Sequence, residues 1–168
     1  MHVFYTPDIA TNVEMPEEEA GHCLRVLRLT TGDEVILTDG KGKFYKAVIS
    51  AATNKRCQLK IVETLPQEKG WTGWLHVAMA PTKNMDRTEW LAEKATEIGF
   101  DELTFLSTRY SERKVIKTER IEKILVSAIK QSLKPNKPVL NEMTDFGKFI
   151  TQDFKGQKFI CHCHEGDK

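Results

Sequence analysis

The alternation of apolar and polar residues predicts that the first part of the chain consists mostly of β-strands. Residues 34–38 and 43–51 flank the turn Asp39-Gly40-Lys41-Gly42, a pattern typical of a β-hairpin. Further strands are expected at 2–5 and 57–62. Several short strands at close spacing favour a small β-barrel.

One amphipathic helix is expected between the first two strands, starting at Pro16 and ending before Gly32. Its apolar face would use Ala20, Cys23, Leu24 and Leu27. His22, Arg25 and Arg28 recur at a spacing of three, so an α-helix would place them in a row beside that face.

A polar, glycine-containing stretch at 66–73 marks a boundary, after which the hydrophobic period changes. The expected strands are 75–80, 103–107 and 158–163, and the expected helices are 86–98, 118–133 and 145–151. Strands that alternate with helices predict an α/β domain with a mainly parallel sheet. The sequence therefore predicts two domains, residues 1–68 and residues 71–168.

The two longer helices have recognisable ends and faces. In the first helix we expect Asp86 to cap the start, with Glu89 three residues on, and Gly99 to end it. Its expected buried residues are Leu91, Ala95 and Ile98, with Arg87 and Lys94 at the apolar edge. The second helix should bury Ile121, Leu125, Ala128 and Ile129.

The 168 residues are 40% hydrophobic and 29% charged, as in an ordinary globular protein, and the formal net charge is +1. Residues 109–137 nevertheless contain nine Lys or Arg and only three Glu. Such a tract can attract a phosphate backbone. Taken alone, a charge run is more often a solvated helix face.

Several classes of protein and site are not expected. No apolar stretch is long enough to cross a membrane and the N-terminus has no signal-peptide pattern, so we expect a cytoplasmic protein. The run Cys161-His162-Cys163-His164 would alternate between the faces of a strand, so no metal site is expected. The sequence also lacks a glycine-rich phosphate loop and a GxSxG motif.

Cationic side chains follow the expected strands of the second domain. Lys83 follows the first strand, and Arg109 and Arg113 follow the second. The carboxyl ends of parallel strands share one edge, where ligands bind in open α/β sheets. The pattern predicts an anionic ligand at this edge.

The order and spacing of these residues match a known family. The matching positions are His22, Arg25-Val26-Leu27-Arg28, Gly32-Asp33, Asp39-Gly40, Lys83, Arg87, Glu89, Lys94-Ala95-Thr96-Glu97-Ile98-Gly99, Arg109, Ser111, Arg120, Gln131-Ser132 and Pro138. With these residues the chain resembles, over nearly its whole length, the RsmE family of 16S ribosomal RNA methyltransferases, which belong to the SPOUT (trefoil-knot) class.

The resemblance implies an N-terminal PUA-like β-barrel that helps to hold RNA, followed by a SPOUT-type α/β methyltransferase domain. It implies transfer of a methyl group from S-adenosylmethionine to N3 of one uridine in the 16S rRNA of the small ribosomal subunit, by a homodimer. The expected RNA-binding residues are Arg25, Arg28, Lys83, Arg87, Arg109 and Arg113. The sequence singles out no general base, so the catalytic residue is left unassigned.

The chain also departs from the family. Lys130 and Lys134 stand where Glu and Arg are expected, and the GPEGG-like loop and the later Leu-Gly…Leu-Arg-x-Glu-Thr segment that wrap the cofactor are absent from the sequence. We interpret the chain as a fragment with an incomplete SPOUT domain and expect it, alone, to bind S-adenosylmethionine weakly and to be inactive. The expected cofactor contacts are Cys163, His164 and Glu165, because they end the last expected strand.

Two other interpretations of the sequence remain open. The chain could be a non-enzymatic RNA-binding module made of the barrel and the basic helices. It could also be a small α/β domain whose basic face is only solvated, in which case its affinity for RNA would hardly depend on salt.

Overall fold

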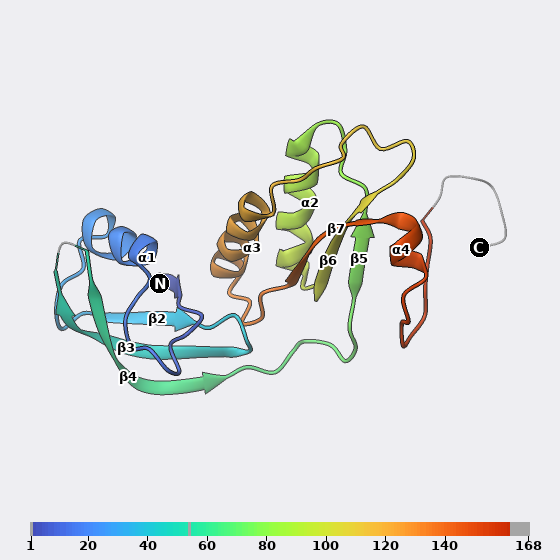
Figure 1. Cartoon of the computed structure of the whole chain (residues 1–168). Coiled ribbons are helices and arrows are strands. Elements are labelled where there is room, and N and C mark those ends of the chain that lie inside the picture. The colour runs from blue at the N-terminus through green and yellow to red at the C-terminus, as the bar shows by residue number, and fades with distance from the viewer. Residues whose placement is uncertain (1, 54, 162–168) are drawn as a thin grey trace.

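The structure is a computed structural model that describes residues 2–53 and 55–161 of the chain. Its strands form two separate sheets, ordered β1-β2-β3-β4 and β5-β6-β7 (Figure 1). The strands are β1 (Val3–Tyr5), β2 (Glu34–Thr38), β3 (Lys43–Ala52), β4 (Cys57–Pro66), β5 (His76–Met79), β6 (Glu102–Ser107) and β7 (Val139–Asp145). The helices are α1 (Glu17–Gly21), η1 (His22–Val26), α2 (Met85–Ile98), α3 (Thr118–Ser132) and α4 (Phe146–Ile150). The expected fold class, a strand-rich N-terminal part followed by an α/β part with a parallel sheet, is confirmed.

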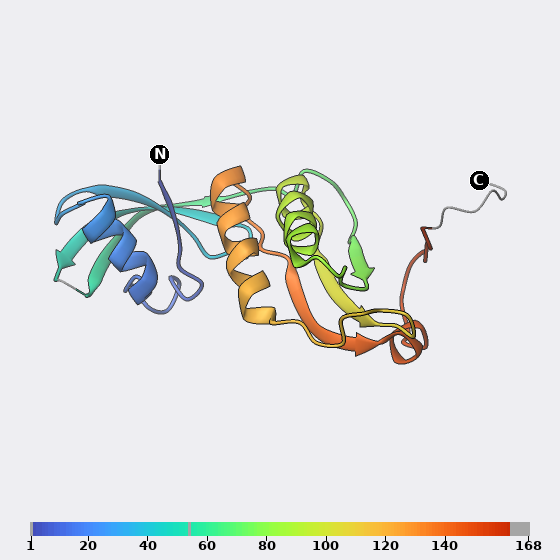
Figure 2. The ribbon, with the colours of Figure 1, turned by 90° about the horizontal axis from the view of Figure 1, so that it is seen from above.

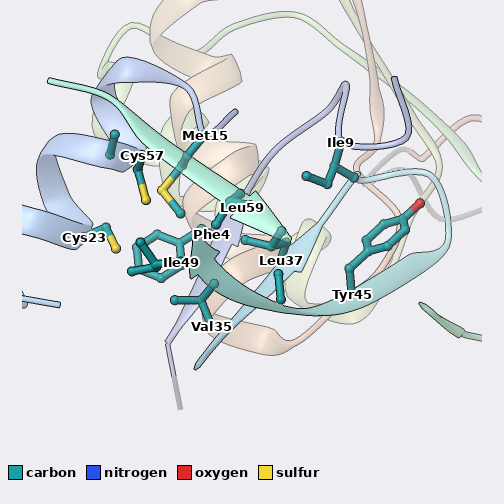
Figure 3. Close-up of a cluster of buried hydrophobic side chains, with 12 residues drawn as sticks. Phe4, Ile9, Met15, Cys23, Val35, Leu37, Tyr45, Ile49, Cys57 and Leu59 are labelled. Carbon is teal, nitrogen blue, oxygen red and sulfur yellow. The ribbon is translucent and has the colours of Figure 1, made fainter. Parts of the chain in front are cut away.

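In the N-terminal part, strands with period-2 alternation surround an apolar core. β1 pairs with β2 in parallel, and β2, β3 and β4 pair antiparallel. The labelled side chains of Figure 3 come from every one of these strands and from the segment between β1 and β2. Cys23 and Cys57 are fully buried in this core, and burial raises the pKa of the Cys23 thiol to about 12. Both cysteines are free thiols.

The first helix differs from the α-helix that the sequence predicts. After α1 the chain continues as the π-helix η1, in which the Leu27 N–H donates to the His22 carbonyl at 3.0 Å. Arg28 lies beyond η1 and has a φ of 57°, in the left-handed region. The expected row of His22, Arg25 and Arg28 on one helix is therefore wrong at Arg28. The π-helix has a wider turn than an α-helix, and it ends before Arg28. The apolar face is as predicted, with Ala20 and Cys23 buried.

In the second part, α2 and α3 cover one face of the parallel sheet β5-β6-β7 (Figure 2). Leu103 and Phe105 of β6 are fully buried against these helices. The four α3 residues expected to face inward, Ile121, Leu125, Ala128 and Ile129, are all buried, as predicted. In both views α3 lies between the N-terminal sheet and α2 (Figures 1 and 2).

The face and the start of α2 differ from expectation. Its buried residues are Thr88, Ala92 and Thr96, while Ile98 is 81% exposed. The helix begins one residue early because Asn84, rather than Asp86, is the cap: its side-chain oxygen accepts from the Asp86 N–H at 3.0 Å. The end at Gly99 is as predicted, with a φ of 115°.

The third strand of the sheet is β7 and not the expected strand at 158–163. Residues 158–161 belong to no strand, and Phe159 and Ile160 are largely exposed. Alternation does not predict β7, because Leu140 and Met143, which both pack on the core, are three residues apart. A register shift between Thr104 and Leu106 of β6 breaks the period of two at this point.

Candidate nucleic-acid interface

The loops that follow β5 and β6 are joined to each other at the carboxyl edge of the sheet. Arg113 Nε donates a hydrogen bond to the main-chain oxygen of Lys83 at 3.0 Å. The Lys83 ammonium forms an ion pair with Glu112 at 3.3 Å, and both side chains are exposed. The structure therefore brings Lys83 and Arg113 together at the edge where the sequence predicts an anion site.

The first loop is held in place by the buried hydroxyl group of Thr88 in the first turns of α2. Thr88 is fully buried, and its Oγ1 accepts from the Thr82 N–H at 3.1 Å and lies 3.0 Å from Thr82 Oγ1. The Thr82 hydroxyl also donates to the Asn84 carbonyl at 2.6 Å. These bonds fix the turn that presents Lys83, and they place Arg87 in the first turns of the helix, where it is exposed.

Arg109 and Tyr110 follow β6 as an exposed pair. The Arg109 guanidinium carbon lies 5.4 Å from the centre of the Tyr110 ring, which is 86% exposed. An exposed aromatic ring beside arginine is the arrangement that proteins use to stack nucleic-acid bases. Tyr110 is not among the residues predicted from the sequence, although an aromatic residue between Arg109 and Arg113 is a signal for base stacking.

Much of the basic tract is neutralised by acidic side chains of the chain itself. Four of its basic residues are paired with glutamates: Arg120 with Glu89, Lys123 with Glu18, Lys130 with Glu19 and Lys137 with Glu122. The charge that could act on a ligand is therefore smaller than the sequence suggests. Within the described residues, five of the predicted RNA-binding residues form no ion pair: Arg25, Arg28, Arg87, Arg109 and Arg113.

These arginines form two groups. Arg25 and Arg28 are exposed on η1 and just beyond it, in the N-terminal part. Arg87, Arg109 and Arg113 lie on α2 and in the loop between β6 and α3, on the other side of α3 from η1 (Figure 2). The sequence predicts both groups, but it does not predict that α3 separates them.

A polar cavity of about 320 Å³ lies on the face of the sheet opposite α2 and α3, and the sequence analysis missed it. Glu102 accepts hydrogen bonds from Trp74 Nε1 at 2.8 Å and from Asn141 Nδ2 at 2.7 Å, and His76 Nε2 lies 2.7 Å from Thr104 Oγ1. Burial alone would raise the pKa of Glu102, but these two hydrogen bonds and the nearby His76 lower it. Because His76, Glu102, Thr104 and Asn141 are hydrogen-bonded to one another or to Trp74, they are already satisfied without a ligand.

The residues expected to contact the cofactor, Cys163, His164 and Glu165, lie outside the described residues. Of the side chains that the structure does bring to the carboxyl edge, Lys83, Arg109 and Arg113 are cationic, so they suit anionic oxygens and do not fit the positively charged sulfonium of S-adenosylmethionine. Residues 2–53 and 55–161 hold no group of three His, Cys, Asp or Glu side chains that could bind a metal ion. They also contain no helix long and apolar enough to cross a membrane.

The chain is similar to known RNA methyltransferases in both sequence and structure. Residues 69–168 match the family model of the RNA methyltransferase domain, and residues 16–62 match that of the RNA methyltransferase PUA domain. A probable rRNA methyltransferase from Porphyromonas gingivalis is 43% identical and superposes with a TM-score of 0.84 over 91% of this chain and 64% of its own. A putative methyltransferase from Legionella pneumophila, solved with its bound cofactor SAM, is 22% identical, with a TM-score of 0.81 over 96% of this chain and 70% of its own.

A curated relative is the ribosomal RNA small subunit methyltransferase E of Bacillus subtilis, which is 24% identical over 145 residues. The match covers 82% of this chain and 56% of the relative, so the chain spans a little over half of that protein's length. The family model of the methyltransferase domain covers more than half of the chain, and the expected resemblance is confirmed. The chain belongs to the RsmE-like family of RNA methyltransferases.

Proposed function

We propose that the protein transfers a methyl group from S-adenosylmethionine to N3 of a uridine in the 16S rRNA of the small ribosomal subunit. The observation that carries the proposal lies in the loops at the carboxyl edge of the parallel sheet, where Arg113 is bonded to the Lys83 loop and Arg109 lies against the exposed ring of Tyr110. The name of the Bacillus subtilis relative supports rRNA of the small subunit as the substrate. The SAM-bound Legionella pneumophila structure supports the cofactor.

The arrangement suits the chemistry of the reaction. Uridine N3 carries a proton that must leave before or during methyl transfer, and guanidinium groups close to the base stabilise the resulting negative charge. Tyr110 offers a face on which an unpaired base can stack. S-adenosylmethionine would supply the methyl group, and Cys163, His164 and Glu165 remain the proposed contacts to it. The proton acceptor stays unassigned.

A homodimer and a cytoplasmic location are part of this proposal. The exposed side of α2 carries Trp90, 63% exposed, and Ile98, 81% exposed, two turns apart on the helix. These two exposed apolar side chains flank Lys94, which is paired with Glu93 and Glu97, and they support a self-complementary contact between two copies. Sedimentation equilibrium should report a dimer that Trp90→Glu converts to a monomer, and a monomeric wild-type protein would contradict this part of the proposal.

The reaction is tested with tritiated S-adenosylmethionine and 16S rRNA, using the complete open reading frame that encodes this sequence. Methylation of N3 blocks base pairing, so reverse transcription should stop at one uridine. Arg109→Ala should lower transfer while the protein remains folded. Label on an atom other than uridine N3 would contradict the proposed specificity.

Three further measurements test the proposal against the alternatives. Calorimetric titration of the 168-residue chain is expected to show weak or undetectable binding of S-adenosylmethionine, and tight binding would refute that expectation. A steep decrease of rRNA affinity with salt supports phosphate contacts, whereas a flat dependence favours a merely solvated basic face. If the protein encoded by the complete reading frame binds RNA but transfers no methyl group, the non-enzymatic RNA-binding module is favoured.

A further inference from the structure

The N-terminal part is attached to α3 by a nearly buried ion pair. Lys130 Nζ lies 2.6 Å and 2.9 Å from the two carboxylate oxygens of Glu19 on α1, and their side chains are 22% and 13% exposed. The neighbouring pair of Lys123 and Glu18, at 2.9 Å, is 69% and 82% exposed. Exposed pairs contribute little, so Lys130 and Glu19 form the effective electrostatic contact.

A second contact joins the hairpin turn to the segment after α3. The Gly42 N–H donates to the Pro135 carbonyl at 3.0 Å, and the Lys137 N–H donates to the Gly40 carbonyl at 2.8 Å. Gly40 has a φ of 71°, and a Cβ built there would lie 2.9 Å from the Tyr5 ring. Burial, together with the nearby Glu122 carboxylate, raises the pKa of Tyr5 to about 12. The family-matching Asp39-Gly40 turn is thus part of a tight contact between the two domains.

The two contacts together restrict rotation as well as separation. α3 buries Ile121 and Leu125 in the α/β core, so it moves with the methyltransferase domain. One contact lies on the last turns of α3 and the other just beyond its end. Two attachment points to one rigid element prevent the hinge motion that a single linker between domains would permit.

We propose that this latch, defined as the Glu19–Lys130 pair together with the pairing of residues 40–42 with 135–137, holds the two arginine groups at a fixed separation so that one RNA molecule contacts both at once. The proposal rests on the RNA-binding role proposed above. Linked contacts on one rigid body raise the effective concentration of the second contact, and a loose linkage would lose this advantage. It also gives a role to Lys130, which departs from the residue expected in the family.

The latch is tested first without RNA. Spin labels at Lys60→Cys and Glu142→Cys, two exposed positions on β4 and β7, report the distance between the domains, with Cys161 and Cys163 replaced by serine. The buried thiols of Cys23 and Cys57 have raised pKa values, so they should react slowly with the label. Wild-type protein should give one narrow distance distribution, and Lys130→Glu should broaden it.

Charge exchange separates the latch from a general loss of folding. The double variant Glu19→Lys with Lys130→Glu restores the pair with reversed sign and should restore the narrow distribution. Lys123→Glu, at the exposed pair, is the matched control and should leave the distribution unchanged. A distribution that stays narrow in Lys130→Glu, or one that the exchange fails to restore, would overturn the proposal.

The second readout is binding of in vitro transcribed 16S rRNA. Lys130→Glu should weaken binding at least about tenfold, and the exchange variant should recover most of the loss. In the wild-type protein, alanine substitution of both arginine groups together should lose less binding free energy than the sum of the two separate losses. The reason is that removing either group alone already abolishes the advantage of two linked contacts. In the Lys130→Glu background, the losses of binding free energy from the two substitutions should be additive. Additive costs in the wild type would contradict simultaneous contact, while absence of any rRNA binding would contradict the proposed function and leave the distance result standing.

Discussion

The side chain of Arg113 is hydrogen-bonded through Nε to the main-chain oxygen of Lys83, at 3.0 Å across two loops that lie 30 residues apart in sequence. The bond leaves the two terminal nitrogens of the guanidinium available, so the same side chain can join the loops and face an anion.

Arg113→Ala should therefore weaken rRNA binding about tenfold and reduce the slope of log affinity against log salt by about one. The reason is the loss of one phosphate contact and of the tie that positions Lys83. Fluorescence anisotropy with labelled rRNA at several salt concentrations measures both quantities. Arg120→Ala is the control, because the Arg120 charge is already paired with Glu89 at 2.8 Å. Equal salt slopes for the two variants would rule out a phosphate contact at Arg113.

Gly40→Ala should destabilise the protein more than Gly32→Ala. Both glycines have positive φ values, 71° and 99°, so each substitution has a backbone cost of about 1–2 kcal/mol. A Cβ at Gly40 would also meet the Tyr5 ring and Lys137, whereas a Cβ at Gly32 meets nothing within 4 Å. Urea unfolding of the two variants measures the difference, and equal stabilities would show that the Gly40 contact carries no packing cost.

Asn84→Ala should lower the free energy of unfolding by about 1 kcal/mol, because it removes the side-chain acceptor for the first turn of α2. Asp86→Asn removes only a favourable charge from that turn and should cost a few tenths of a kcal/mol. Thermal unfolding followed by circular dichroism compares the two. Because Asn at position 86 would still be able to cap the helix, Asp86→Ala is the variant that tests the other cap, and a larger loss for it than for Asn84→Ala would show that Asp86 caps α2.

The sequence predicts those elements whose signal is local. The hairpin around Asp39-Gly40 and the four buried residues of α3 appear as expected, because alternation and helical spacing respond directly to one buried face. The elements that the sequence does not predict correctly depend on tertiary contacts. The buried side of α2 is rotated toward Thr88 and Thr96, because their hydroxyls find partners at Thr82 and at the Ala92 carbonyl. Strand β7 was missed because its register shift disrupts the alternation.

The candidate site shows the same division. Its cationic residues can be read from the sequence, because strand ends of a parallel sheet meet at one edge. The sequence does not show which of these charges remain free to bind a ligand, because ion pairing depends on contacts between distant segments. Lys130, for example, lies 111 residues from its partner Glu19. A count of basic residues therefore overstates the field that the folded protein presents.

Acid pH should destabilise the α/β part through Glu102. Hydrogen bonds from Trp74 and Asn141 and the neighbouring His76 lower its pKa against the opposing effect of burial. A carboxyl whose pKa is lowered on folding contributes stability above its unfolded pKa of about 4.3, and this stability is lost as the pH falls through the folded value. Glu102→Gln removes the titration, so the difference in free energy of unfolding between wild type and variant should shrink from pH 6 to pH 3.

Trp74 fluorescence during denaturation reports this difference, because its indole nitrogen donates to the Glu102 carboxylate at 2.8 Å. Asn141→Ala provides a second variant that keeps the carboxyl but removes a donor to it at 2.7 Å. It should shift the acid loss of stability to higher pH, because the ionised carboxylate is then less well stabilised. A difference between wild type and Glu102→Gln that stays constant with pH would mean that the polar lining of the cavity does not hold Glu102 in its charged form.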